Sequence, residues 1–474
     1  MFMSMFKSAL FLVIIWCCCF YPSYGCLEEE RTHLLQIKDS INYPHGSSLD
    51  EYWVGKNCCN WFWIECNSSS SRVISISLHW IRSDERLGLW YPNASLFAAF
   101  KELEELDLIG NHIGGWVAPQ AFSEMQSLRN LYLWENNLSA SSDSVRGLCD
   151  LKNLRGLYLD ENNLDGITLS PCLSNLSMLE NLSLSGNDLG SYSSTLTGLC
   201  ELKNLRFLNL DINNLDGRAF PPCLSNLPKL ETLLLLGNNL GSYSSALTGL
   251  CGLSTLKSLD LSVNHFDDSS LPMCIGNFSL LENLYLFENN LSGHFGNSIS
   301  GLKRLQVLHL ASNQLTDDGI SPWISNLTSL IVLRLGRNKL KGSNTMRGLC
   351  GLSALTSLYL SDNYLSSLPI CMGNFSSLEK LELSRNNLTN LFSNSIPGLK
   401  GLQELHLESN QLTDVGISPW ISNLTSLAEL YLGNNKLKGS DTMRVRGLAM
   451  ATIVSISTGK SIDRDVWVWA GYMR

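Results

Sequence analysis

The stretch LKNLRGLYLDENNLDG, residues 151–166, decides the fold of this chain. Its pattern LxxLxLxxNxL recurs fourteen times at spacings of 23 to 26 residues, beginning at Leu103, Leu128, Leu154, Leu179, Leu205, Leu230, Leu256, Leu281, Leu305, Leu330, Leu355, Leu378, Leu402 and Leu427. Every copy carries its asparagine, from Asn111 to Asn435. A period of this length is typical of solenoids, in which each repeat buries its apolar face against the next.

The chemistry of the repeat predicts a strand followed by a turn. In each LxL the two leucines are expected to point inward and the residue between them outward, because side chains alternate along a strand. The buried asparagine can then hydrogen-bond backbone groups left free where the chain leaves the sheet. Stacked repeats therefore predict an α/β solenoid, a superhelix with a parallel concave sheet and short helical or 3-10 segments on the convex side.

Residues 1–25 have the features of a secretory signal. Lys7 precedes an apolar run from Ala9 to Phe20, and small residues Ser23 and Gly25 stand at the -3 and -1 positions before Cys26. The alternative, a membrane anchor, needs roughly 20 apolar residues, and this run is shorter. We therefore expect the secretory pathway, ending in the extracellular space or apoplast, or at the plasma membrane if a longer form carries a membrane span.

Cysteine spacing within the array suggests disulfides between consecutive repeats. Three of the 15 cysteines lie in the predicted signal, which leaves an even number for an oxidising compartment. Eight of the remaining cysteines occupy two fixed positions, either five residues before the first leucine of a repeat or seven residues before the first leucine of the next repeat. Where one of these positions holds a cysteine, so does the other. The expected pairs are Cys149–Cys172, Cys200–Cys223, Cys251–Cys274 and Cys350–Cys371. Alternatively, duplication of a two-repeat unit copied two unrelated buried thiols.

Asn-x-Ser/Thr sequons are a second feature of the secretory route. They predict glycosylation at Asn67, Asn93, Asn137, Asn175, Asn277, Asn290, Asn326, Asn374, Asn387 and Asn423. Several of them lie four residues before a first repeat leucine, on the expected convex side. A further sequon, Asn181, occupies an outward strand position, where a glycan would block part of the concave face.

The chain resembles plant extracellular leucine-rich-repeat proteins. The phrases GLCELKNLRFL (198–208) and PPCLSNLPKL (221–230) are similar to repeats of plant receptor-like proteins, and CLEEERTHLLQIKDSI, CCNWFWIEC (58–66) and RVISISL resemble their N-terminal cap. The resemblance covers residues 26 to about 448. It implies a cap with a first degenerate strand at 26–80, the repeat array at 81–448, and a divergent, poorly ordered tail at 449–474.

In this family the cap is held by bridges that correspond here to Cys26–Cys58 and Cys59–Cys66. They would tie the amphipathic segment with Leu34, Leu35, Ile37 and Ile41 over the first coil, while Trp53, Trp61 and Trp63 cover the leucine core. Trp63 stands where glycine is usual. A zinc site is disfavoured, because adjacent Cys58 and Cys59 lack the spacing by which two thiolates share one ion.

No enzyme chemistry is indicated. The eight histidines are scattered, no GxSxG, HExxH or Walker loop occurs, and the net charge of -9 argues against nucleic acid as a partner. We therefore expect no catalytic residues, no metal ligands and no cofactor.

Outward strand residues are the candidate ligand contacts, because they have no packing role. Large aromatic residues there resemble interface anchors, although strand propensity also favours them. The candidates are Tyr132, Trp134, Tyr158, Asp211, Tyr285, Phe287, His309, Arg334 and Tyr359. Asp160, Glu161 and Asp211 make the N-terminal part acidic, and Arg334 and Arg337 make a later basic spot.

The resemblance implies a non-enzymatic recognition ectodomain that binds an extracellular peptide, protein or glycan on the concave face in defence or development. A membrane-anchored co-receptor kinase is the implied partner. Residues 449–474 contain no repeat, cysteine or capping motif, which suggests a truncated product in need of such a partner. The alternatives are a secreted polygalacturonase-inhibitor-like protein, although those proteins have a C-terminal cysteine cap that is missing here, or a non-functional truncated product.

Overall fold

The computed structural model describes residues 25–41, 48–139, 145, 147–190, 196–219, 222–342, 344–368, 370–389, 398–414, 424–437 and 452–455. The chain divides into two compact units, Met1–Leu182 (unit 1) and Ser183–Arg474 (unit 2). Each unit is described by itself.

Unit 1 consists of the cap and the first repeats. Its strands are β1 (Ile64–Cys66), β2 (Val73–Ser77), β3 (Glu105–Asp107), β4 (Asn130–Tyr132) and β5 (Gly156–Tyr158). Its α-helices are α2 (Glu28–Ile41), α3 (Ala94–Ala98) and α5 (Gly166–Leu173). Its 3-10 segments are η1 (Ser48–Asp50), η2 (Cys58–Asn60), η3 (Glu85–Leu87), η4 (Pro119–Glu124) and η5 (Gly147–Asp150). Strand β6 (Asn181–Ser183) follows at the boundary between the units in the sequence.

Unit 2 consists of the later repeats. Its strands are β7 (Phe207–Asn209), β8 (Thr232–Leu234), β9 (Ser258–Asp260), β10 (Asn283–Tyr285), β11 (Val307–His309), β12 (Val332–Arg334), β13 (Ser357–Tyr359), β14 (Lys380–Glu382), β15 (Glu404–His406), β16 (Glu429–Tyr431) and β17 (Thr452–Ser455). Its helical segments are α6 (Asp317–Ile324), η6 (Thr197–Glu201), η7 (Gly217–Ala219), η8 (Pro222–Asn226), η9 (Leu240–Gly252), η10 (Met273–Asn277), η11 (Gly296–Ser298), η12 (Asn344–Gly351) and η13 (Ile370–Asn374).

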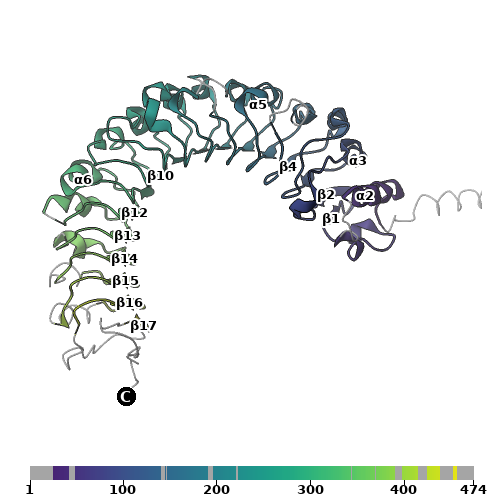
Figure 1. The fold of residues 1–474 in the computed structure, drawn as a ribbon. Coiled ribbons are helices and arrows are strands. Elements are labelled where there is room, and N and C mark those ends of the chain that lie inside the picture. Colours follow the sequence, from purple (N-terminus) through teal and green to yellow (C-terminus); the bar gives the residue numbers. More distant parts are fainter. Residues whose placement is uncertain are drawn as a thin grey trace, which may run out of the picture. The chain divides into compact units, whose positions relative to one another are not determined.

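Strand β1 pairs antiparallel with β2, and the repeat strands of both units pair in parallel, with their leucines opposite one another. Leu106 pairs with Leu131 and Leu131 with Leu157 in unit 1, and the same register continues through β7 to β16 in unit 2. Within each unit the strands line one side and the helical segments the other, as Figure 1 shows. Leu208 and Leu333 are fully buried between these layers. The predicted parallel-sheet solenoid is confirmed.

The repeat asparagines form a hydrogen-bonded ladder along the core. The Nδ2 atom of Asn338 donates to the carbonyl of Leu335 in its own repeat and to that of Leu310 in the preceding repeat, each at 3.0 Å. Its Oδ1 atom accepts from the N–H of Leu315 at 2.9 Å. Asn136 makes the equivalent contacts in unit 1. Each buried amide therefore ties two successive coils together.

The residue before each ladder asparagine has a left-handed backbone conformation in all fourteen repeats, with φ between 50° and 69°. The positions are Gly110, Glu135, Glu161, Gly186, Ile212, Gly237, Val263, Glu288, Ser312, Arg337, Asp362, Arg385, Ser409 and Asn434. Only three of them are glycine, so composition provided no uniform signal for this turn. The β-branched residues Ile212 and Val263 are the least suited to it.

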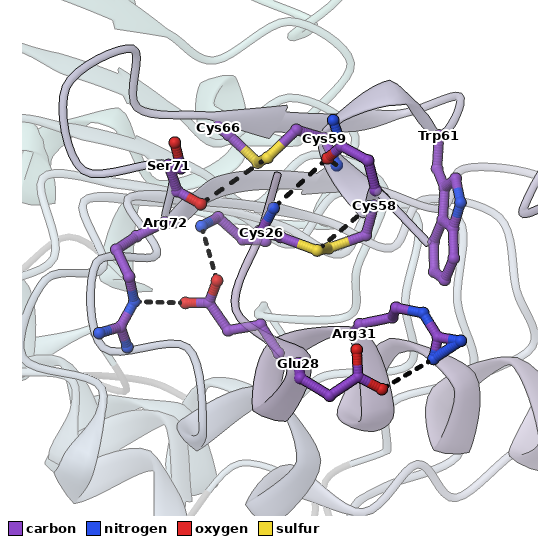
Figure 2. The surroundings of a disulfide bond; sticks show 12 residues. Cys26, Glu28, Arg31, Cys58, Cys59, Trp61, Cys66, Ser71 and Arg72 are labelled. Atoms are coloured by element: carbon purple, nitrogen blue, oxygen red, sulfur yellow. Dashed lines mark hydrogen bonds and ion pairs between the residues drawn. A yellow bond between two sulfur atoms is a disulfide. The ribbon is translucent and has the colours of Figure 1, made fainter. Parts of the chain in front are cut away.

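The cap has the two disulfides that the family resemblance implied. Figure 2 shows Cys26 joined to Cys58 and Cys59 joined to Cys66, next to Trp61. Helix α2 buries Leu34, Ile37 and Ile41.

A buried carboxylate that sequence reasoning missed joins this helix to β2. One oxygen of Glu30 accepts from Nε of Arg72 at 2.8 Å, and the other accepts from the backbone N–H of Val73 at 3.2 Å. Glu30 is only 1% exposed, so its charge is balanced within the cap.

The cap tryptophans divide into two groups. Trp53 and Trp61 are buried and stacked with ring centroids 5.4 Å apart, and each donates its indole N–H to a backbone carbonyl. Trp63 is half-buried and has a φ of 66°. This left-handed conformation is the physical reason why glycine suits that position.

The four pairs of array cysteines expected from the offsets are bonded in the structure. Cys149–Cys172 lies in unit 1, and Cys200–Cys223, Cys251–Cys274 and Cys350–Cys371 lie in unit 2. Their Cα atoms are 4.7 to 5.6 Å apart. Each bridge joins helical segments of successive coils on the side away from the sheet.

Both predicted terminal segments lie largely outside the described residues. Of the predicted signal, only Gly25 is described, and of the predicted tail only Thr452–Ser455, which pairs with β16 as strand β17. Within the part of the chain that the structure describes, no helix has the length and apolar character needed to span a membrane.

Candidate recognition surface on the sheet face

Strand pairing arranges the outward residues of each unit in a row, which we call the sheet face. In unit 1 the row is Ser77, Asp107, Tyr132 and Tyr158. In unit 2 it is Asn209, Leu234, Asp260, Tyr285, His309, Arg334, Tyr359, Glu382, His406 and Tyr431. Apart from Asp211, the sequence-predicted candidates therefore separate into two clusters, one in each unit.

The unit 1 cluster is formed by four aromatic side chains. Tyr132 and Tyr158 stack with ring centroids 4.7 Å apart and planes only 5° from parallel. Trp134 meets Trp80 edge to face at 6.1 Å. Trp80 is 47% exposed and belongs to the coil before the first full repeat, which is why the repeat pattern did not single it out. These two pairs come from the coils of β2, β4 and β5.

Aromatic side chains of the cap form a second group in unit 1. The ring of Trp63 packs edge to face against Tyr52 at 5.4 Å and against His79 at 6.4 Å, and Phe62 lies 6.0 Å from it. Phe62 is 60% exposed. Because His79 directly precedes Trp80, this group borders the four-ring cluster. Most large apolar side chains that are exposed in the described residues belong to unit 1.

Acidic groups surround the unit 1 aromatics. Burial raises the pKa of Glu105, with a further contribution from Asp107. Burial, aided by the charge of Glu105, also raises the pKa of Tyr132 to about 12. Both shifts report a poorly hydrated, negative environment, which favours a ligand that brings positive charge or hydrogen-bond donors.

A cavity of about 450 Å³ opens at the turn beside this surface. It is lined by Gly88, Leu89, His112, Glu135, Asn136, Asn137 and Glu161. Burial and the neighbouring carboxylate of Glu161 raise the pKa of Glu135. Of the residues predicted to make this part acidic, Glu161 lines the cavity, together with Glu135.

The unit 2 cluster combines aromatic rings with a cation. Phe287 stacks on His309 at 4.7 Å, and Tyr285 meets the same imidazole edge to face at 6.3 Å. The guanidinium of Arg334 lies over the ring of Tyr359. Burial, with a smaller contribution from Arg334, lowers the pKa of His309 to about 4. His309 is therefore neutral at physiological pH.

Asp211 is separated from both clusters in its contacts. Its Oδ1 atom accepts from the backbone N–H of Leu236 at 2.6 Å. This bond links two coils, and it gives the side chain a structural role that the sequence pattern could not reveal.

Predicted glycosylation sites differ in exposure. Asn175, Asn277, Asn290, Asn326, Asn374 and Asn387 are exposed. Asn67 and Asn93 accept backbone hydrogen bonds from the residue two positions on, and Asn137 lines the unit 1 cavity. Asn423 lies outside the described residues.

Comparison with protein families identifies the modules of the chain. The leucine rich repeat N-terminal domain matches residues 27–67, and leucine rich repeat models match residues 303–322, 353–412 and 376–437. The chain therefore carries this N-terminal cap followed by leucine-rich repeats.

Plant receptor-like proteins are among its relatives. Cuscuta receptor 1 of Solanum lycopersicum is 29% identical over 87% of this chain, and receptor-like protein EIX1 of the same plant is 28% identical over 78%. Lumican of Coturnix japonica is 34% identical over 51% of the chain. The chain spans 40%, 34% and 60% of the lengths of these three relatives.

Solved structures show the same fold. An internalin from Listeria monocytogenes is 28% identical with a TM-score of 0.57, covering 70% of this chain and 89% of the internalin. The Arabidopsis receptor kinase HAESA, solved with the peptide hormone IDA and the co-receptor SERK1, is 23% identical with a TM-score of 0.51, covering 87% of this chain and 78% of HAESA. At that identity HAESA supports the fold alone.

Proposed function

We propose that this leucine-rich-repeat chain, whose homologues include plant receptor-like proteins, is a non-enzymatic extracellular recognition ectodomain. One observation carries the proposal: in unit 1, Trp80 packs against Trp134 and Tyr132 stacks on Tyr158, two aromatic pairs that lie outside the leucine core. Clustered, partly exposed aromatic rings with acidic neighbours are typical of binding surfaces.

The ligand is an extracellular peptide, protein or glycan. Aromatic rings provide large rigid contact areas at little cost in conformational entropy. The acidic groups Glu105, Asp107 and Glu135 favour a ligand that carries basic side chains or many hydroxyl donors.

The relatives support a receptor context. Two of them are named as a receptor and a receptor-like protein. This chain spans less than half of their length, so its biological role is part of the proposal. We propose that it takes part in signalling in defence or development, with a membrane-anchored co-receptor kinase as partner, and that it is located outside the cell or at the plasma membrane.

The test is a binding screen with the purified chain. Arrays of extracellular plant peptides and cell-wall oligosaccharides identify a binder, whose affinity is then measured for Trp134→Ala, for the double variant Tyr132→Ala/Tyr158→Ala, and for the control Tyr364→Ala. Tyr364 is 58% exposed and belongs to neither cluster. We expect both unit 1 variants to lose about thirtyfold in affinity or more, and the control to be unchanged.

Two results would overturn the proposal. Equal affinity of all variants would place the ligand elsewhere on the chain. Direct inhibition of a polygalacturonase by the chain would instead identify an inhibitor of a wall-degrading enzyme.

A further inference from the structure

Two glutamates and a histidine converge on the sheet face of unit 2, next to its aromatic cluster, because Glu382 pairs with Tyr359. Glu382 ends β14, His406 ends β15, and Glu408 follows two residues later. One ligand atom from each of the three lies within 4.8 Å of the other two. All three side chains are partly buried, and His406 and Glu382 are only 19% and 17% exposed.

The spacing of these atoms suits a metal ion. Nδ1 of His406 lies 3.3 Å from Oε2 of Glu382 and 3.9 Å from Oε1 of Glu408. Bonds of about 2.0–2.2 Å to a tetrahedral ion put neighbouring ligand atoms about 3.3–3.6 Å apart. An ion could therefore be held by these three atoms after small side-chain rotations.

Ser384 orients both carboxylates toward the histidine. Its backbone N–H donates to Oε1 of Glu382 at 3.0 Å, and its hydroxyl donates to Oε2 of Glu408 at 2.6 Å. The remaining oxygen of each carboxylate is the one that faces Nδ1. Hydrogen bonds of this kind, which hold the non-coordinating atoms of the ligands, are characteristic of metal sites.

The imidazole of His406 packs face to face against an aromatic ring. Tyr431 stacks on His406 with ring centroids 4.2 Å apart and planes 11° from parallel. The other ring nitrogen, Nε2, is buried without a hydrogen-bond partner, and the carboxylate of Glu404 lies 3.9 Å from it. With a metal on Nδ1, Nε2 carries the proton and faces the carboxylate of Glu404, which also pairs with Lys380.

We propose that Glu382 Oε2, His406 Nδ1 and Glu408 Oε1 form a binding site for one divalent ion of the zinc or manganese class. One imidazole and two carboxylates are the donor set that such ions accept, whereas calcium and magnesium prefer oxygen donors alone. Three protein ligands leave at least one coordination position for water or for a carboxylate of a bound partner. Sequence reasoning missed the site because its ligands lie on two different coils.

The test uses the tag-free full chain and Zn²⁺ or Mn²⁺ in isothermal titration at pH 8. The neighbouring carboxylates of Glu408 and Glu382 raise the pKa of His406, so an alkaline buffer reduces competition from protons. We expect one ion per chain at micromolar concentration and a rise in Tm on binding. His406→Gln, Glu382→Gln and Glu408→Gln should abolish both effects, and Ser384→Ala should weaken binding about tenfold.

His309→Gln is the matched control, because His309 occupies the same strand position but its sheet-face neighbours are Tyr285, Phe287 and Arg334. Its binding should equal that of the unchanged chain. Circular dichroism and the Tm of each variant without metal show that it is folded. Absence of binding by the unchanged chain, or binding that survives in the folded Gln variants, would overturn the proposal. Neither result bears on the unit 1 recognition surface.

Discussion

The guanidinium carbon of Arg334 lies 4.5 Å from the ring centroid of Tyr359, on the neighbouring strand. The same register pairs Arg334 with His309 on the other side. A cation therefore lies between an aromatic ring and an imidazole, and its charge adds to burial in lowering the pKa of His309.

Stability should fall on acidification through His309. Its folded pKa of about 4 lies below the ordinary value of 6.5, so the unfolded chain binds a proton first as the pH falls. The contribution of neutral His309 to the free energy of unfolding is fully present above about pH 6.5 and is lost as the pH falls from 6.5 to 4. Urea midpoints at pH 7 and pH 4.5 measure the effect. His309→Gln should lose less stability over this interval than the unchanged chain, and an equal loss would contradict the assignment.

Removal of a ladder asparagine should be costly. Asn338→Ala leaves the N–H of Leu315 and the carbonyls of Leu310 and Leu335 without their amide partner in the core, so we expect a loss of about 2–3 kcal/mol. Asn226→Ala, at an exposed position, should change stability by less than about 0.5 kcal/mol. Urea denaturation of both variants decides the matter, and equal midpoints would argue against the ladder.

Ile212→Asn should stabilise the chain. Ile212 is 56% exposed and has a φ of 52°, a conformation that costs a β-branched residue about 1–2 kcal/mol and that asparagine tolerates better. We expect a gain of about 1 kcal/mol, measured as a higher Tm. Ile331→Asn, next to a strand, is the control and should show no gain. A lower Tm for Ile212→Asn would mean that its apolar contacts outweigh the strain.

The Cys251–Cys274 bridge should stabilise unit 2. Cys251→Ser/Cys274→Ser removes a loop constraint of roughly 3 kcal/mol, so the urea midpoint should fall. Mass spectrometry of a non-reduced digest should show the two peptides linked in the unchanged chain. Free thiols at both positions would support the alternative of copied, unbridged cysteines.

Glycan occupancy should follow exposure. We expect sugars at the exposed sequons Asn175, Asn277 and Asn326 and little at Asn137, which lines the unit 1 cavity. Glycopeptide mapping of the chain expressed through a plant secretory pathway measures this occupancy. High occupancy at Asn137 would place a glycan at the cavity and move any ligand contact away from it.

The repeat period determined most of the architecture in advance. Leucines at fixed spacing can be buried only by stacking coils, so the strands, the core and the asparagine ladder followed from the pattern. Cysteines at matched offsets lie on neighbouring coils for the same reason. Backbone conformation at the turns did not follow, because the left-handed residue is glycine in some repeats and Glu, Ile or Arg in others.

Sequence alone thus determined which residues face out of the sheet, and only the tertiary structure decided which of them meet. Trp80 with Trp134, Phe287 with His309, and Glu382 with His406 and Glu408 each lie on different coils. Whether such side chains stack, pair or converge depends on rotamers and on the register between coils. The repeat period predicts that these side chains lie on nearby coils, but it does not predict the directions in which they point.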